Sequence, residues 1–288
     1  MPGRPGLADY VERWAPGPVT DGDPIAPGPI AALAAALDVG EVATAPGERV
    51  LPFWHWLYFL EWPRRAELGA DGHPAEGDFY PPIPDRRRMI AGGRLRVADP
   101  LEIGVAAQRT RGLAGVRVKE GRTGEMVFVT VRSEISQGGR VRVVEEQDVV
   151  YRSGEDPGRA SLTSIDLGGE PVSDAGWQRR FDTDSRLLFR FSALTANAHR
   201  IHYDEPYVTG VEGYPGLVVH GPLLVLLMGE LARGSSKREV ATFDYRLRRP
   251  VFVGESILVT GDSAGPGAEF GITTARESAH ATAEVSFR

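Results

Sequence analysis

The feature that most constrains this chain is an internal repeat. The segment PLEIG, residues 100–104, returns as PVFVG, residues 250–254. Three strand-like runs follow each copy, and in the last of them Ala281, Ala283, Val285 and Phe287 alternate with polar neighbours, which is the pattern of a strand with one buried face. The runs cover residues 105–120, 125–136 and 140–152 after the first copy, and 256–264, 268–278 and 280–288 after the second. The repeat therefore predicts two similar halves rich in antiparallel strands.

Each half also contains an apolar segment of helical length. PIAALAAALD, residues 29–38, lies in the first half, and LVVHGPLLVLLMGELARG, residues 217–234, lies in the second. A sheet must cover its apolar face, and wrapping the sheet around such a helix is the simplest way to do so. The expected fold class is α+β, with two antiparallel sheets that each wrap around a central helix.

The boundary between the halves falls near the middle of the chain. Between Tyr151 and Trp177 the sequence is rich in Ser, Gly, Asp and Pro and has little apolar period, which is typical of a linker. We therefore expect a first domain over residues 1–152, a linker over 153–176 and a second domain over 177–288. The Pro- and Gly-rich first thirty residues are expected to run over the surface.

Composition narrows the function classes. The 288 residues carry a net charge of -6, which disfavours nucleic acid as a partner. Neither an apolar run of about 18 residues nor an apolar signal-peptide stretch occurs, so we expect no membrane association or export but a cytoplasmic protein. Because the chain has no cysteine, thiolate metal sites and thiol nucleophiles are excluded.

Polar residues gather after FRFSAL, residues 189–194, which we expect to be a short strand. The turn that follows holds Asn197, His199, His202 and Asp204, and a Gly-flanked helix begins close to His220. An imidazole titrates near neutral pH, and the first amide N–H groups of a helix lack intrahelical partners. This arrangement is typical of an acid/base site beside a helix N-terminus.

These motifs resemble the MaoC-like (R-specific) enoyl-CoA hydratase/dehydratase family in its double-hotdog form. SALTANAHRIHYD, residues 192–204, and EGYPGLVVHGPL, residues 212–223, are similar to a subgroup with mesaconyl-CoA and itaconyl-CoA hydratases and mitochondrial 3-hydroxyacyl thioester dehydratases. PFWHWLYF, PPIPDRRRMIAGGRL and EEQDVVYR resemble the first halves of the mesaconyl-CoA type. The resemblance implies a degenerate first hotdog domain of the FAS1-like dehydratase type and a catalytic second hotdog domain.

The resemblance also implies an activity: hydration of an enoyl-CoA, or dehydration of a 3-hydroxyacyl thioester. CoA is then part of the substrate, and no other cofactor is expected. His202 falls at the position of the family's catalytic histidine, and Asn197 stands where the family has aspartate. Asparagine cannot exchange a proton, although its amide can hold a water. Either His202 makes both proton transfers or Asp204 supplies the missing carboxylate; we favour His202 with Asn197, because a side chain two residues later in an extended segment points away.

Other residues receive supporting roles. The resemblance implies that the backbone at Gly221 binds the thioester oxyanion, since helix N-terminal amides carry positive dipole charge. His220 either lines the site or packs at the helix start, and His199 either supports the site or is structural. Asp204 is expected to bond backbone N–H groups of the next turn. The histidine spacing matches no metal motif, so we expect no metal.

Three consecutive arginines, Arg86, Arg87 and Arg88, lie beside a Gly pair. In the repeat, we expect this segment to correspond to the HGP helix start of the second half. If the substrate bears a second carboxylate, as mesaconyl and itaconyl groups do, one of them could clamp it bidentately. Otherwise they are solvated or meet CoA phosphates. An aromatic patch forms either the acyl pocket or ordinary core: Phe53, Trp54, Trp56, Tyr58 and Phe59.

Several alternatives stay open. The substrate could be a carrier-protein thioester rather than a CoA thioester, or the chain could be a hotdog thioesterase. The asparagine at position 197 also keeps a non-catalytic acyl-CoA-binding protein under consideration. A double hotdog can close its pseudo-dimer interface within one chain, and further pairing into a homo-oligomer is left open.

Overall fold

The computed structural model describes residues 5–40, 42–121, 124–153, 165 and 167–288. The strands are β1 (Val19–Asp23), β2 (Arg86–Val97), β3 (Ala107–Gly121), β4 (Gly124–Gln137), β5 (Arg140–Ser153), β6 (Trp177–Phe181), β7 (Val240–Leu247), β8 (Ile257–Ala264), β9 (Gly267–Thr273) and β10 (Ala281–Phe287). The α-helices are α1 (Leu7–Val11), α2 (Pro27–Ala36), α3 (Ser185–Leu194), α4 (Glu205–Gly210) and α5 (Gly221–Ser235). Short 3-10 helices are η1 (Trp54–Leu57), η2 (Arg65–Glu67) and η4 (Arg200–His202).

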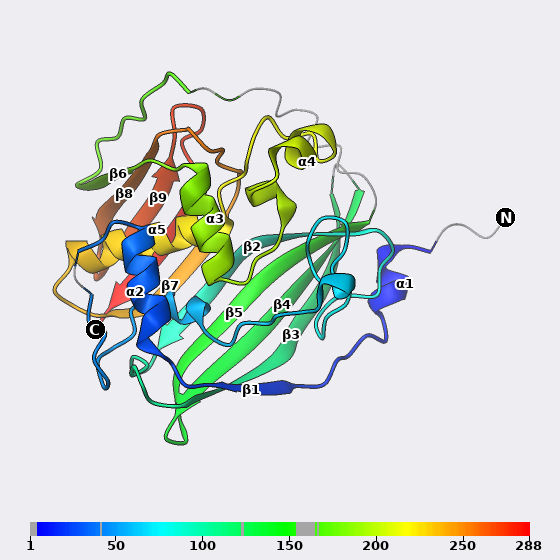
Figure 1. Ribbon diagram of the computed structural model, residues 1–288, viewed down its shortest axis with the longest axis horizontal. Helices are drawn as coiled ribbons and strands as arrows, with labels where there is room; N and C mark the ends of the chain where they lie inside the picture. The colour runs from blue at the N-terminus through cyan, green and yellow to red at the C-terminus, as the bar shows by residue number, and fades with distance from the viewer. Residues whose placement is uncertain (1–4, 41, 122–123, 154–164, 166) are drawn as a thin grey trace.

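The described strands form one antiparallel sheet in the order β1-β3-β4-β5-β2-β7-β10-β9-β8-β6 (Figure 1). The strands of each half are contiguous, and β2 pairs with β7 to join the halves, from Gly92 opposite Arg246 to Arg96 opposite Thr242. The α+β class is therefore confirmed. The two predicted sheets are continuous, because β2 of the first half pairs with β7 of the second.

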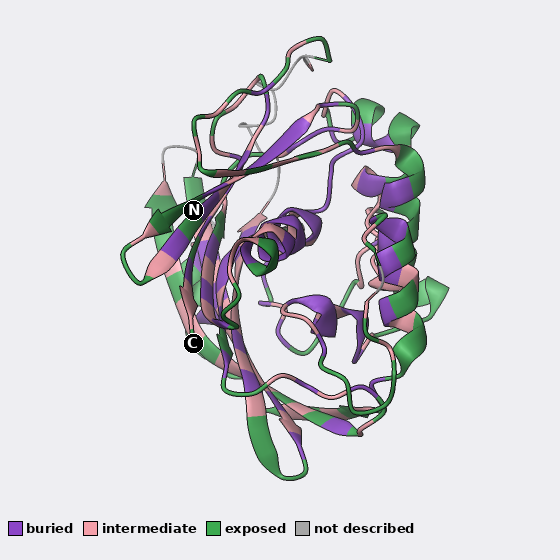
Figure 2. Cartoon of the chain, turned by 90° about the vertical axis from the view of Figure 1, so that its left-hand side faces the viewer, coloured by how far each residue is buried: buried purple, intermediate pink, exposed green. Residues whose placement is uncertain are grey.

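Helix α5 fills the curve of the second half. It packs against β6, β7, β8, β9 and β10, and Figure 2 shows it nearly end on, inside the curved sheet, coloured as buried. All residues from Leu223 to Glu230 are buried. A helix that is apolar on every side must be enclosed, which is why this segment becomes the core of the domain.

The first half departs from the expected arrangement. Helix α2 forms where the sequence predicts it, but it packs mainly against α3 and η1 rather than inside the curve of β3, β4 and β5. Its Ala-rich surface allows close packing between helices and offers little bulk for filling a sheet. The expectation of a central helix in each sheet is met by α5 and not by α2.

The repeat itself is confirmed. Gly104 and Gly254 end the two PLEIG-like segments, and both have left-handed backbone, with φ of +76° and +91°. Isolated bridges at Arg49 with Glu102 and at Val218 with Phe252 tie the two segments to the rest of the chain. The six predicted strands appear as β3, β4 and β5 and as β8, β9 and β10.

Two local expectations are wrong, and a third, that the first thirty residues run over the surface, holds for most of residues 5–30 although they form regular elements. FRFSAL forms the end of α3, which Asp184 caps by accepting a hydrogen bond from Leu187 N–H at 2.8 Å. Arg86, Arg87 and Arg88 begin strand β2 and do not precede a helix. The first thirty residues contain α1, β1 and the start of α2. Helical spacing of buried Leu187, Leu188 and Phe191 explains α3, because helix periodicity outweighs aromatic strand preference.

Half of the predicted linker, residues 154–164 and 166, lies outside the described residues. Within the described chain, β5 ends at Ser153 and β6 begins at Trp177. None of the described helices is both long and apolar enough to cross a membrane.

The joint between β2 and β7 depends on glycine at position 92. A Cβ there would lie 2.5 Å from the Tyr245 carbonyl oxygen, a backbone atom that cannot move away. We expect Gly92→Ala to lower the free energy of unfolding by about 1–3 kcal/mol, as overpacking does. Thermal and denaturant unfolding measure this. The matched control is Gly112→Ala in β3, where a Cβ meets nothing within 4 Å, and equal destabilisation of both variants would contradict the explanation.

Candidate active site

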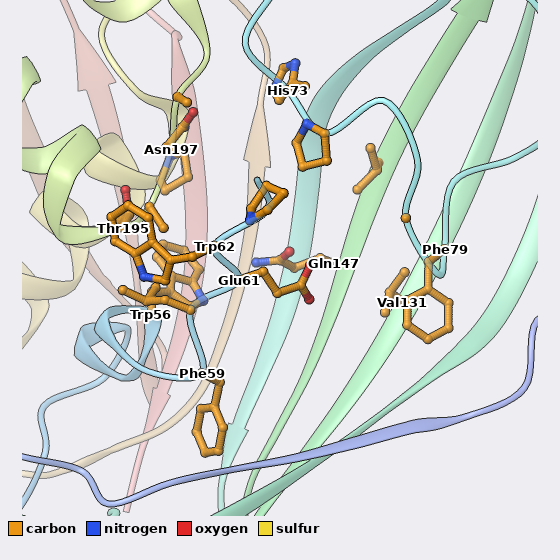
Figure 3. Close-up of a pocket in the computed structure, with 18 of the residues that line it drawn as sticks. Trp56, Phe59, Glu61, Trp62, His73, Phe79, Val131, Gln147, Thr195 and Asn197 are labelled. Atoms are coloured by element: carbon orange, nitrogen blue, oxygen red, sulfur yellow. The ribbon is translucent and has the colours of Figure 1, made fainter. Parts of the chain in front are cut away.

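A cavity of about 700 Å³ lies between the two halves. Strands β3, β4 and β5 of the first half form one wall, and the segment 189–198 with Pro222 of α5 forms another. Figure 3 shows His73 and Asn197 at the same end of the cavity, on loops from different halves. The cavity therefore needs both domains.

Asn197 lines this cavity in a fixed orientation. Its backbone N–H donates to Ser192 O at 2.9 Å at the end of α3, and Ala196 before it has a left-handed φ of +50°. Its side-chain Oδ1 accepts the His199 N–H at 2.9 Å. This bond orients the carboxamide so that its Nδ2 group remains as a directed donor to a bound water.

His202 lies in η4 and is 7% exposed. Its Nδ1 donates to the Val218 carbonyl at 2.7 Å, which leaves Nε2 as the basic nitrogen. Among the described residues Nε2 has no hydrogen-bond partner, and the surrounding packing does not enclose this atom completely. Burial lowers the pKa of His202 to about 4, so the imidazole is neutral at physiological pH.

His220 stacks on His202, with ring centroids 3.6 Å apart. Its Nε2 forms a hydrogen bond with Ser192 Oγ at 2.9 Å, and burial lowers its pKa well below the ordinary value. The residues that line the cavity do not include His202, His220 or His199. The structure thus places Asn197 at the cavity surface, whereas the imidazoles of His202 and His220 are enclosed in the packing.

Asp204 caps α4, as expected. Its Oδ1 accepts the Tyr207 N–H at 3.1 Å, and its Oδ2 binds Arg200 at 2.8–2.9 Å. The hydrogen bonds from Arg200 and from the Tyr207 backbone lower the pKa of Asp204. Because both carboxylate oxygens are engaged in these contacts, the structure supports a structural role for Asp204 as the cap of α4.

The start of α5 has fewer free backbone N–H donors than the start of a typical helix. Pro222 reaches the cavity but has no N–H, and Leu224 N–H already donates to the His220 carbonyl. The amides of Gly221 and Leu223 are left as candidate oxyanion donors. A Cβ at Gly221 would lie 2.5 Å from Leu247 Cδ1, so packing also favours glycine here.

The three arginines have separate environments. Arg86 donates to the Pro81 and Ala75 carbonyls, and Arg87 pairs with buried Glu212 at 3.7 Å. Arg88 alone of the three lines the cavity, where its guanidinium lies over the Tyr80 ring and donates to the Tyr80 hydroxyl. No carboxylate within the described parts of the chain pairs with Arg88.

The aromatic patch is divided between the two roles that the sequence left open. Phe53 and Trp54 are fully buried core, and Trp54 Nε1 donates to Glu230 of α5 at 2.9 Å. Trp56 lines the cavity, and its Nε1 donates to Glu145 at 2.9 Å. Tyr58 and Phe59 line it as well.

Sequence reasoning missed two residues of this site, Asp71 and His73. With His199 they bring one oxygen and two imidazole nitrogens within 4.8 Å of one another, a donor set that could hold a divalent cation. The segment DGHP, residues 71–74, has the composition of a turn. It shows no apolar period and lies far in sequence from the other polar residues, so the sequence did not connect it with the site.

Comparisons with known proteins agree with this architecture. The hydroxyacyl-thioester dehydratase type 2 family matches residues 53–253. The mesaconyl-C(4)-CoA hydratase of Chloroflexus aurantiacus is 47% identical over 221 residues, 77% of this chain and 78% of that protein. A mitochondrial hydroxyacyl-thioester dehydratase type 2 of Schizosaccharomyces pombe is 27% identical over 74% of this chain and 78% of its own length. A Mycobacterium tuberculosis protein with a double hotdog fold superposes with a TM-score of 0.57 at 13% identity, over 98% of each chain.

The buried neutral His202 predicts a pH-dependent stability. In the unfolded chain a histidine takes up a proton near pH 6.5, whereas the folded protein resists protonation of His202 down to about pH 4. Stability should therefore fall as pH decreases from about 6.5 to 4, and His202→Asn, which keeps a donor for Val218, should remove on the order of 3 kcal/mol of that fall. Denaturant unfolding across this range measures it. Identical pH profiles for the two proteins would contradict a neutral, buried His202.

Proposed function

Because this chain belongs to the hydroxyacyl-thioester dehydratase type 2 family, we propose that it adds water to an enoyl-CoA thioester that carries a second carboxylate. The family and the similar proteins are hydratases and dehydratases, so the chain is a carbon-oxygen lyase acting on acyl thioesters. The 47% identity to a mesaconyl-C(4)-CoA hydratase supports mesaconyl-CoA or a related dicarboxylic acyl group as substrate.

Arg88 is the observation that carries the choice of a dicarboxylic substrate. A cationic guanidinium in a partly enclosed cavity normally has an anionic partner, because desolvating a charge without compensation is costly. Among the described residues, Arg88 contacts the hydroxyls of Tyr80 and Tyr151, and burial raises the pKa of Tyr151 to about 12. The nearby Asp71 carboxylate, which is hydrogen-bonded to His73, interacts with Arg88 only through longer-range charge. A planar carboxylate of the substrate fits this guanidinium as a bidentate partner.

The reaction follows from the groups around Asn197. The carboxamide Nδ2 holds the attacking water, and the basic Nε2 of His202 takes its proton as oxygen bonds to the β-carbon. The amides at the start of α5 stabilise the enolate oxygen that develops on the thioester. Addition of water leaves the overall oxidation state of the acyl group unchanged, so the proposal includes no redox cofactor, and CoA serves only as part of the substrate.

The mouth of the cavity suits a long, partly apolar arm. Trp62, Phe189 and Tyr203 line the cavity and remain exposed, which is unusual for large apolar side chains unless a ligand contacts them. We assign this rim to the pantetheine arm of CoA. The acyl group then extends inward toward Asn197 and Arg88.

The activity is tested with purified protein and crotonyl-CoA, mesaconyl-CoA and itaconyl-CoA. Hydration removes the conjugated double bond, so ultraviolet absorbance of the enoyl thioester should decrease. His202→Asn should lower kcat by about 100-fold or more, the usual contribution of a positioned proton-transfer group. Binding of every thioester without any loss of absorbance would instead indicate a non-catalytic acyl-CoA-binding protein.

The role of Arg88 predicts a change in substrate preference. Arg88→Met keeps an unbranched, flexible side chain and removes its charge, so kcat/KM for mesaconyl-CoA should fall by roughly 10- to 100-fold, the value of a charge-assisted hydrogen-bond pair. Hydration of crotonyl-CoA, which lacks the second carboxylate, serves as the internal control and should change less than about threefold. An equal loss on both substrates would show that Arg88 is structural.

A further inference from the structure

A loop of the first half, residues 69–74, lies directly on the Asn197 turn of the second half. Arg200 N–H donates to the Asp71 carbonyl at 2.8 Å, and Arg200 Nη1 donates to the Ala70 carbonyl at 2.9 Å. Within the loop, Gly69 N–H donates to the His73 carbonyl at 2.7 Å. One backbone hydrogen bond and one side-chain hydrogen bond of Arg200 therefore hold this loop to the second half.

Gly72 shows how close this approach is. Its φ of +89° lies in the left-handed region, and a Cβ added to it would lie 1.9 Å from the Ala198 carbonyl oxygen. Only glycine permits both the backbone conformation and the approach. Glycine at position 72 therefore allows the loop to place Asp71 and His73 against residues 197–199.

His73 is oriented by Asp71. Asp71 Oδ1 accepts the His73 backbone N–H at 2.9 Å, and its Oδ2 accepts Nδ1–H, also at 2.9 Å. The ring of His73 lines the cavity and lies 3.9 Å, centroid to centroid, from the ring of His199. Since Nδ1 faces the carboxylate, Nε2 is the nitrogen left to exchange a proton with a ligand.

We propose that His73, oriented by Asp71, is a further catalytic residue that exchanges the α-proton of the thioester. His73 then takes the proton-transfer role of the carboxylate that the family resemblance implies at the position of Asn197. This inference rests on the proposed hydration activity and adds a second proton-transfer group from the other half of the chain.

The step balances with two imidazoles. His202 Nε2 takes a proton from water while the water oxygen bonds to the β-carbon and the π electrons of the double bond move into the thioester as an enolate. The imidazolium of His73 gives its Nε2 proton to the α-carbon as the enolate electrons form the new C–H bond. The proton on His202 then returns to His73 through His199, which lies between their rings, or through water, so the enzyme regains its starting state.

The surroundings decide which imidazole carries the proton. His73 faces the carboxylate of Asp71, whereas His202 Nδ1 faces only a neutral carbonyl. Burial and the charge of Arg88 lower the pKa of His73 below its ordinary value, because the hydrogen bond and charge of Asp71 oppose them only in part. A substrate carboxylate bound to Arg88 offsets that charge, so binding of the dicarboxylic substrate favours the protonated His73 that the step requires.

The test compares His73→Gln and Asp71→Asn with wild type in the absorbance assay. We expect His73→Gln to lower kcat by about 100-fold or more and Asp71→Asn by about tenfold or more, with KM within about threefold. The double variant His73→Gln with Asn197→Asp restores a carboxylate at the family position and should recover at least about tenfold of the lost kcat. A purely structural role for the loop predicts no such recovery.

Gly72→Ala tests the approach of the loop, with Gly47→Ala as the matched control. Gly47 has a similar φ of +86°, and a Cβ there meets nothing within 4 Å, so both variants carry the same backbone strain. Only Gly72→Ala should lower kcat, while thermal unfolding reports the shared strain in both.

The outcomes separate the two proposals. A wild-type protein that hydrates no enoyl thioester overturns the proposed function and this inference together. An active wild type with unchanged kcat in His73→Gln, or no recovery in the double variant, overturns only the role of His73. Loss of activity on treatment with EDTA, restored by zinc or magnesium, would assign Asp71, His73 and His199 to a metal instead.

Discussion

The pairing of β2 with β7 is the constraint on which the rest of the structure depends. It turns two half-sheets into one, and Gly92 allows the backbones to meet without a side chain between them. Once the halves are fixed, α5 has a closed curve to fill and the loop at residues 69–74 has a defined partner at Asn197. The cavity exists because this joint sets the separation of the two domains.

Burial gives the site its chemical character. His202 and His220 are stacked in an enclosed layer, and desolvation keeps both neutral because neither faces a carboxylate. Polar groups with access to the cavity, Asn197, His73 and Arg88, stand in front of this layer. A division between a neutral buried base and a charged cavity surface is suited to a reaction in which charge develops on a thioester oxygen.

Periodicity predicted those elements that bury one face or all faces. Buried and less buried residues alternate along much of β4, β5, β9 and β10, and α5 is buried from Leu223 to Glu230, so local pattern and tertiary burial agree there. Strand β2 was missed because only its last four residues, 94–97, alternate polar and apolar side chains, and pairing with β5 and β7 determines the rest. FRFSAL was misassigned because six residues do not contain enough period to separate strand from helix.

The sequence by itself determined the two-fold repeat, the central helix of the second half and the cluster of Asn197, His202 and Asp204, because each is written in neighbouring residues. Only the tertiary structure decided that Arg88 faces the cavity while Arg86 and Arg87 do not, and that Asp71 and His73 lie against Asn197. The physical reason is that the ion pair of Arg87 with Glu212 and the contacts of Asp71 and Gly72 with residues 198–200 join positions more than a hundred residues apart. Strand pairing and the close approach at Gly72 bring them together, and no local pattern encodes either.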